Sequence, residues 1–241
     1  MSLNKTKIEW TDFTWNPITG CWGPGGSREK PNWCPYCYAK KIATRFEGTI
    51  AFPRGFEPTF HPDRLVEPYK LKKPSRIFTC SMSDLFGSWL PDHWIGEVLF
   101  TVANNPKHAF MVFTKCPKNL FKWDKFFPAN LWVGVSVNEQ KDIERIFYLR
   151  MIDPKIRFIS FEPLLGPIDI NLDRIDWIII GAQTNPVKIP KKDWVLPLIE
   201  QARKNNIPIF LKNNLHWHEV IQEFPNQRSI QTEKVARLSS L

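Results

Sequence analysis

The sequence predicts an α/β fold: a single partial or complete (β/α) barrel of parallel strands that takes up residues 1–241 as one domain. Three observations support this prediction. Short apolar runs such as 177–180 alternate with helical stretches, and continuous apolar runs suit strands that are covered on both faces. Nearly every run is followed at once by polar or reactive residues, and in a parallel barrel such positions share one rim. A chain of 241 residues is also long enough for one large domain.

Seven strands and four helices are expected. The strands are expected at 13–18, 76–80, 109–113, 131–135, 156–159, 177–180 and 207–211. The helices are expected at 39–46, 91–105, 139–151 and 193–205. Pro91 opens the second helix, where proline is tolerated in the first turn. Residues 52–62 are rich in Pro and Phe without a clear period, and we expect a loop there.

Composition restricts the class of protein. With 43% hydrophobic residues, 11 Trp and 18 Phe, the chain is expected to be globular. No uncharged apolar run reaches the ~18 residues of a membrane helix, so no membrane partner is expected. No export signal opens the chain, which favours the cytoplasm. The net charge of +9 favours nucleic acid as a partner, but the lysines are scattered, and solvated loop charges are an equal alternative.

Residues 15–39 contain three of the five cysteines and form the centre of the predicted site. Twelve residues separate Cys21 from Cys34, and two separate Cys34 from Cys37. The longer spacer is rich in Gly and Pro, so it can fold back and bring Cys21 beside the Cys-x-x-Cys pair. Three thiolates that converge without a fourth can hold a cubane iron–sulfur cluster and leave one iron open.

Three other interpretations of these cysteines stay open. A structural zinc site needs four ligands, but the nearest histidine is His61 and no second Cys-x-x-Cys exists. A disulfide is disfavoured by the odd number of cysteines and by the lack of an export signal. A thioredoxin-like redox pair would leave Cys21 unexplained.

The motif around these cysteines resembles the cluster loop of radical S-adenosylmethionine (radical SAM) enzymes. The matching residues are Asn16-Pro17-x-x-Gly20-Cys21 and Cys34-x-Tyr36-Cys37-Tyr38-Ala39. The nearest pattern is the branch that contains spore photoproduct lyase. With the sequence KIEWTD at 7–12, the chain further resembles the phage-type three-Cys-motif family. It departs from the superfamily in its spacing, because three residues usually separate the first two cysteines, although longer spacers occur.

The resemblance implies a 4Fe-4S cluster on Cys21, Cys34 and Cys37, with S-adenosylmethionine bound to the open iron. One electron from a donor of the flavodoxin or ferredoxin type would cleave S-adenosylmethionine, and the radical so formed would take a hydrogen atom from a substrate. The cofactor carries the difficult chemistry and the protein supplies geometry. The function expected is therefore a radical SAM enzyme, with a nucleic acid or another large molecule as the candidate substrate.

The resemblance also assigns cofactor contacts by position. The residue between the second and third cysteines would pack by the adenine, the loop after the second strand would bind the methionyl amine, and residues after the fourth strand would contact the ribose. The loop after the second strand lacks the usual Gly-Gly-Glu and offers hydroxyls and a carboxylate instead. The residues expected to bind the cofactor are Tyr36, Ser81, Ser83, Asp84, Ser136 and Asn138.

Three further residues at strand ends are expected to take part in catalysis. Glu162 and Lys212 match positions of substrate or cofactor contacts, and a charged group directly after a buried strand is costly without a partner. Cys80 ends the second strand and is a candidate hydrogen-atom donor by resemblance to the lyase branch, with Cys116 as a weaker one. Core burial, the ordinary fate of a free cysteine, is an equal alternative for both.

Two other functions stay open. One is a non-catalytic iron–sulfur or zinc-binding, nucleic-acid-binding module on the same fold. The other is a barrel hydrolase built on Glu162 and His61, which lacks any paired catalytic motif. Formation of 5′-deoxyadenosine after anaerobic reconstitution would separate the radical SAM enzyme from the module.

Overall fold

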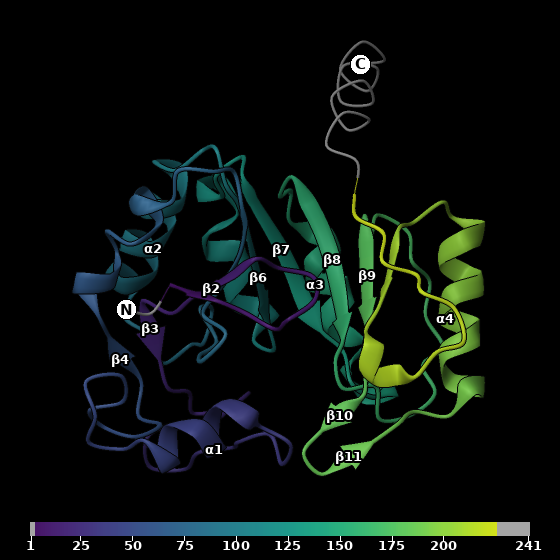
Figure 1. Cartoon of the computed structure of the whole chain (residues 1–241), viewed down its shortest axis with the longest axis horizontal. Helices are drawn as coiled ribbons and strands as arrows, with labels where there is room; N and C mark the ends of the chain where they lie inside the picture. Colours follow the sequence, from purple (N-terminus) through teal and green to yellow (C-terminus); the bar gives the residue numbers. More distant parts are fainter. Residues whose placement is uncertain (1–2, 226–241) are drawn as a thin grey trace.

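A computed structural model describes residues 3–225 and contains an eight-stranded, mostly parallel sheet (Figure 1). In sheet order the strands are β1 (Asn4–Lys5), β2 (Phe13–Trp15), β5 (Arg76–Thr79), β6 (Ala109–Thr114), β7 (Leu131–Ser136), β8 (Ile156–Phe161), β9 (Trp177–Ile180) and β12 (Ile209–Leu211). Only β1 is antiparallel to its neighbour. The seven predicted parallel strands are confirmed, with bounds that differ by a few residues.

The sheet is an open, partial barrel. Within residues 3–225, β1 and β12 are its two edges, and no strand pairing joins them. The free edge of β12 is partly covered by the chain that follows it, because Phe210 forms a bridge with Gln222. The prediction of a partial or complete barrel of parallel strands is thus confirmed in its partial form.

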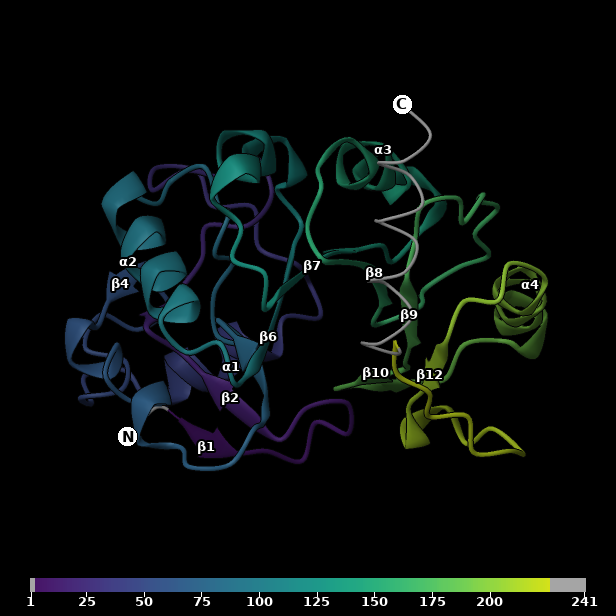
Figure 2. The same cartoon turned by 90° about the horizontal axis from the view of Figure 1, so that it is seen from above.

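Residues 3–225 form four α-helices, as predicted: α1 (Tyr38–Arg45), α2 (Asp92–Ala103), α3 (Glu144–Met151) and α4 (Lys192–Lys204). The helix expected at 139–151 is divided, because Glu139 caps a separate 3-10 turn, η5 (Gln140–Asp142), before α3 begins. Figure 2 shows α2, α3 and α4 outside the curved sheet. None of the helices in the described part of the chain is long and apolar enough to cross a membrane.

Two hairpins were not predicted, because strands of two residues show no periodicity. They are β3 (Ile18–Thr19) with β4 (Thr59–Phe60), and β10 (Gln183–Thr184) with β11 (Val187–Lys188). The other 3-10 helices are η1 (Pro62–Arg64), η2 (Pro68–Lys70), η3 (Pro117–Lys122), η4 (Asp124–Phe126) and η6 (Asn213–Leu215). At the bottom of Figure 1, α1 and the β10–β11 hairpin lie at the same end of the sheet, where Lys41 Nζ donates to the Asn185 carbonyl.

The two faces of the sheet have different cores, because successive side chains of a strand point to opposite faces. The helix-covered face is mostly aliphatic and forms one cluster that includes Val133 of β7, Leu149 of α3 and Leu198 of α4. The concave face carries a cluster that is rich in aromatic rings: Trp10, Phe78, Met111, Trp132, Ile156, Phe158, Trp177, Ile179 and Phe210. Aromatic side chains therefore fill the interior of the partial barrel.

Trp177 is the hub of this aromatic cluster. It is fully buried, and its ring lies 5.4–6.4 Å from the rings of five others, those of Trp10, Trp132, Phe158, Phe210 and Phe224. Trp177→Ala should lower the free energy of unfolding by about 3–5 kcal/mol, because a large cavity would remain. Urea denaturation measures this change. The matched control Phe147→Ala removes a ring that is 57% exposed, and an equal loss in both variants would contradict the assignment of Trp177 as the hub.

A buried polar group holds the β3–β4 hairpin, whose first strand leads into Cys21. His61 is 7% exposed, and its Nε2 lies 2.9 Å from Thr19 Oγ1 on β3. Burial, together with the nearby Arg64 guanidinium, lowers the pKa of His61 to about 4. The Arg64 guanidinium donates to the Asn16 carbonyl at 2.9 Å, and the Arg64 carbonyl accepts from Trp15 Nε1 at 2.9 Å. Through these two hydrogen bonds, Arg64 fixes the segment after β4 to Trp15 of β2 and to the adjacent Asn16.

The neutral His61 makes stability depend on pH. The pKa of His61 in the folded chain, about 4, lies below the ordinary value of 6.5. Between these two pH values His61 is therefore protonated in the unfolded chain but neutral in the folded chain. His61 should therefore contribute a loss of stability as the pH falls from 6.5 towards 4. His61→Gln should flatten the pH dependence of the denaturation midpoint in that window. The exposed His218→Gln is the control, and identical curves for His61→Gln and the wild type would contradict the prediction.

Candidate active site

A cavity of about 350 Å³ lies at the carboxyl ends of the parallel strands. Ten of the twelve predicted site residues line it: Cys21, Cys34, Tyr36, Cys37, Cys80, Ser81, Ser83, Asp84, Glu162 and Lys212. They come from the loops after β2, β5, β8 and β12, which are far apart in sequence. The inference that polar residues after the strands share one rim therefore holds for these positions.

The cysteine loop folds back as the Gly and Pro content suggested. Gly23 has a φ of +81°, and a Cβ there would lie 1.8 Å from the Asn32 carbonyl oxygen, so only glycine fits at this crossing. The Gly23 N–H donates to Cys21 Sγ at 3.1 Å. Cys37 caps the N-terminus of α1, where its Sγ accepts from the Lys40 N–H at 3.3 Å. Two of the three sulfurs thus receive backbone hydrogen bonds.

These three cysteines fit a cluster with three protein ligands by their chemistry. They belong to one loop, line one cavity, and two of them accept N–H bonds of the kind that tune iron–sulfur groups. Burial is the main cause that raises the pKa of both Cys21 and Cys37, so a bound metal would have to displace their protons. The fit is one of ligand chemistry and not of a preformed geometry, because within residues 3–225 no group of three or more His, Cys, Asp and Glu side chains is arranged to hold a metal ion.

A seam of hydrogen bonds joins the cysteine loop to the loop after β5. Asn16 Oδ1 accepts from Ser81 Oγ at 3.1 Å and from the Met82 N–H at 2.9 Å. Gly20 donates its N–H to the Met82 carbonyl at 2.9 Å and accepts from Ser83 Oγ at 2.6 Å. The predicted cofactor residues Ser81 and Ser83 are therefore held in place by the start of the cysteine motif.

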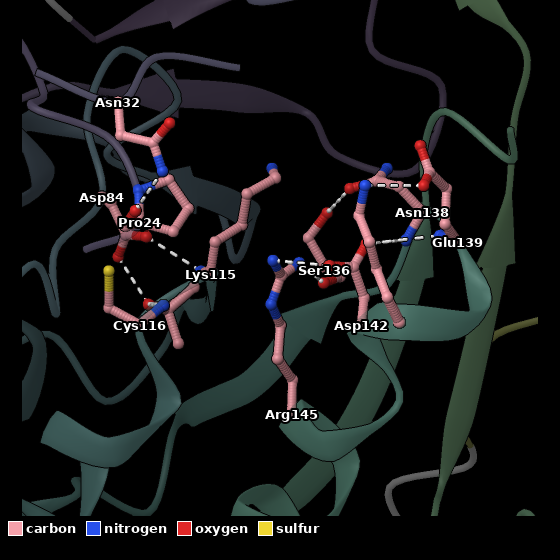
Figure 3. A network of polar contacts seen from close by, with 12 residues as sticks. Pro24, Asn32, Asp84, Lys115, Cys116, Ser136, Asn138, Glu139, Asp142 and Arg145 are labelled. Carbon is pink, nitrogen blue, oxygen red and sulfur yellow. Dashed lines mark hydrogen bonds and ion pairs between the residues drawn. The ribbon is translucent and has the colours of Figure 1, made fainter. Parts of the chain in front are cut away.

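Asp84 connects this loop to the one after β6. Its Oδ1 accepts from Thr114 Oγ1 at 2.6 Å, and its Oδ2 accepts from the Lys115 N–H at 2.8 Å (Figure 3). Asp84 is 8% exposed but also lines the cavity. The carboxylate thus has a structural role, and its predicted contact with a methionyl amine stays a prediction.

Ser136 and Asn138 are the two predicted residues that do not line the cavity. They are 0% and 2% exposed, and Asn138 Oδ1 accepts from the Tyr36 hydroxyl at 2.7 Å. The Asn138 N–H donates to Asp142 Oδ2 at 3.0 Å, and Arg145, paired with Asp142 at 2.7 Å, donates to the Ser136 carbonyl (Figure 3). This network orients Tyr36. A direct contact between the ribose and Ser136 or Asn138 stays a prediction.

Glu162 and Lys212 form an ion pair on the cavity wall, with Nζ 3.0 Å from Oε1. The other carboxylate oxygen accepts from Trp10 Nε1 at 3.1 Å and from Ser160 Oγ at 3.2 Å. The charge of Glu162 raises the pKa of Lys212, so the ammonium is retained despite its burial. The expectation that the buried Glu162 needs a partner is met by this pair.

The two remaining cysteines differ in burial, since Cys80 is buried and Cys116 is partly exposed. Cys80 is 2% exposed and belongs to the aliphatic core, although it also borders the cavity. Burial raises the pKa of the Cys80 thiol, and the Ile18 N–H bonds to it. Burial likewise raises the pKa of Cys116, which does not line the cavity. These surroundings favour the core role for Cys80, and hydrogen donation by Cys80 or Cys116 stays a prediction.

Among the cavity-lining residues to which the sequence analysis assigned no site role, four form much of the wall. Phe78 and Phe113 form its apolar wall together with Trp10, and Lys115 adds an ammonium. A signal existed for Lys115, because it follows β6 as the other site residues follow their strands. No comparable signal existed for Trp10, which reaches the cavity from the segment before β2.

Comparison with protein families shows one family model, described as "Protein of unknown function (DUF5131)", that matches residues 5–237. No curated protein matches the chain. The nearer resemblance to the phage-type three-Cys-motif family stays a prediction.

Solved structures of spore photoproduct lyase have the same fold. One in complex with dinucleoside spore photoproduct superposes with a TM-score of 0.50 at 13% identity, covering 84% of this chain and 64% of that one. A variant with bound AdoMet and dinucleoside spore photoproduct superposes with a TM-score of 0.51 at 12% identity, and the match covers 84% of this chain and 64% of that one. A further variant superposes with a TM-score of 0.50 at 13% identity, and the match covers 99% of this chain and 75% of that one. The chain therefore spans just under two thirds of the first of these relatives.

The predicted fold of the radical SAM type is confirmed by this likeness to spore photoproduct lyase. The chain belongs to the DUF5131 family.

Proposed function

We propose that this protein is a radical SAM enzyme that holds a 4Fe-4S cluster on Cys21, Cys34 and Cys37 and binds S-adenosylmethionine in the adjoining cavity. One observation carries the proposal: three thiols of a single loop line the cavity at the carboxyl ends of a partial parallel barrel. The fold shared with spore photoproduct lyase supports the same class. When bound, the cluster and S-adenosylmethionine would supply the one-electron chemistry that starts a radical reaction.

The chain's own residues would position these groups. Tyr36 would lie against the adenine, fixed by its hydrogen bond to Asn138. Ser81 and Ser83, held by the seam to the cysteine loop, would present hydroxyl groups to the amino-acid end of the cofactor. The aromatic wall would exclude water from the reacting atoms.

Lys115 is proposed to bind the carboxylate of S-adenosylmethionine. Its backbone is fixed by Asp84, and Figure 3 shows its side chain extending from Asp84 towards the Asn138 network. Its Nζ lies 5.9 Å from the Tyr36 ring centre. Among residues 3–225, no carboxylate forms an ion pair with this ammonium.

The substrate is proposed to be large and negatively charged, with nucleic acid as the first candidate. The cavity is bordered by α1 and the β10–β11 hairpin, which contribute Tyr38, Gln183 and Thr184 to its lining. Residues 41–47 and 183–192 together hold five basic residues and one acidic residue. Such a basic rim suits a polyanion. Glu162 and Lys212 would contact the substrate at the inner wall.

The cysteine assignment is tested by iron content. Anaerobically reconstituted protein should bind about four irons per chain and release 5′-deoxyadenosine from S-adenosylmethionine when dithionite is added. Cys21→Ala, Cys34→Ala and Cys37→Ala should each lose the cluster absorption and the cleavage. Cys116→Ala is the matched control and should keep both. Tightly bound zinc without iron after anaerobic purification would contradict the proposal.

The role of Lys115 is tested by cofactor affinity. Lys115→Met should raise the S-adenosylmethionine concentration needed for half-maximal cleavage by about tenfold or more, because a charge-assisted hydrogen bond is worth about 1.5–3 kcal/mol. Iron content should not change. Lys118→Met removes an exposed ammonium from the same segment and should have no effect. An unchanged affinity in Lys115→Met would exclude Lys115 from the cofactor site.

A further inference from the structure

We propose that the outer side of the cysteine loop is a docking surface for an acidic one-electron carrier protein, with Trp33 at its centre. We define the Trp33 surface as Trp33, Lys40 over its ring, and the two arginines Arg28 and Arg54, which pair with Glu57 next to Phe56 of the core under Trp33. This inference rests on the proposed function, because the carrier would deliver an electron to the group held by the three cysteines. It identifies the side of the protein from which that electron arrives.

Trp33 lies between the solvent and the cysteines. It is half-buried and packs with Cys21 and Cys37 against a small core of Ala39, Ala43, Phe52, Phe56 and Met82. Its indole Nε1 donates to the Cys21 carbonyl at 2.7 Å. Its neighbours Cys34, Tyr36 and Cys37 line the cavity, whereas Trp33 does not. On this side, Trp33 therefore covers two of the three cysteines that would hold the cluster.

Lys40 joins the Trp33 ring to the third cysteine. Its ammonium lies 3.6 Å from the ring centre, in a cation–π contact, and its backbone N–H bonds to Cys37 Sγ. Lys40 and the cavity-lining Tyr38 lie about 160° apart around α1, given 100° for each helical residue. The helix therefore places one residue on the cavity side and the other on the outer side of the loop.

The charge on this side favours an acidic partner. Residues 21–56 contain six basic residues and two acidic ones. Arg28 and Arg54 share the carboxylate of Glu57 at 3.6 and 3.7 Å, and their side chains are 73% and 51% exposed. The two guanidinium groups share the Glu57 carboxylate and stay largely exposed, so they can also meet an acidic partner. Complementary charge steers association and fixes orientation.

The other faces of the molecule are less suited to this role. On the convex face, the sheet and its aliphatic core lie under α2, α3 and α4 and separate that surface from the cavity. At the rim between α1 and the β10–β11 hairpin, the cavity must admit S-adenosylmethionine and substrate. The Trp33 surface approaches the cysteines without entering the cavity. A carrier bound there would give up one electron to the cluster, with no bond formed or broken in this step.

The experiment compares two reductants of the cluster-loaded protein. The probes are an acidic bacterial flavodoxin in its reduced form and dithionite, a small reductant that needs no docking surface. Arg28→Glu combined with Lys40→Glu should raise the flavodoxin concentration for half-maximal 5′-deoxyadenosine formation by about tenfold and should weaken its salt dependence. The dissociation constant of oxidised flavodoxin, measured by titration, should rise in parallel. The rate with dithionite should stay at the wild-type value.

The control reverses two exposed charges on η4 and α4 (Lys125→Glu with Lys204→Glu) and changes the net charge equally. It should leave the flavodoxin dependence unchanged, while Lys40→Arg should keep the wild-type affinity. Equal loss of flavodoxin affinity in both double variants would show a net-charge effect and overturn the docking surface. So would unchanged affinity in the Arg28/Lys40 variant, or a matching loss with dithionite. If dithionite gives no cleavage in the wild type, the proposed function itself fails, and the inference with it.

Discussion

The candidate site depends on the hydrogen bonds that fasten the cysteine loop to the loop after β5. A loop rich in Gly and Pro has many accessible conformations, and fixing it costs conformational entropy. The amide oxygen of Asn16 accepts two hydrogen bonds from Ser81 and Met82, and Gly20 adds two more. Because Asn16 and Gly20 lie just before Cys21, the same contacts place the first cysteine and the serines on one wall.

The two faces of the sheet have different roles: the convex face contributes to stability, and the concave face also forms part of the candidate site. Aliphatic residues and three helices occupy the convex face, where they pack into one buried core. Aromatic residues occupy the concave face, and the outermost of them, Trp10, Phe78 and Phe113, also form the wall of the cavity. The rings that stabilise the interior of the barrel therefore shape the apolar part of the binding space as well.

Much of the fold could be predicted from the sequence, because long apolar runs have few alternatives to buried parallel strands. The seven parallel strands and four α-helices were found in this way, whereas the two-residue strands of both hairpins carry no periodic signal. For the site, the positions after strands predicted the residues that line the cavity. They could not distinguish Tyr36, which faces the cavity, from Asn138, which lies behind it, because that difference depends on packing between distant loops.

The Glu162 carboxylate has a consequence for how the protein is made. One of its oxygens bonds to Trp10 and the other to Lys212, while Glu9 accepts a hydrogen bond from the Asn213 N–H. These partners are separated by about two hundred residues of chain. During synthesis the amino-terminal residues emerge first, so the inner wall stays incomplete until residue 212 has left the ribosome. The cysteines of the proposed cluster therefore emerge well before the inner wall of the cavity is complete.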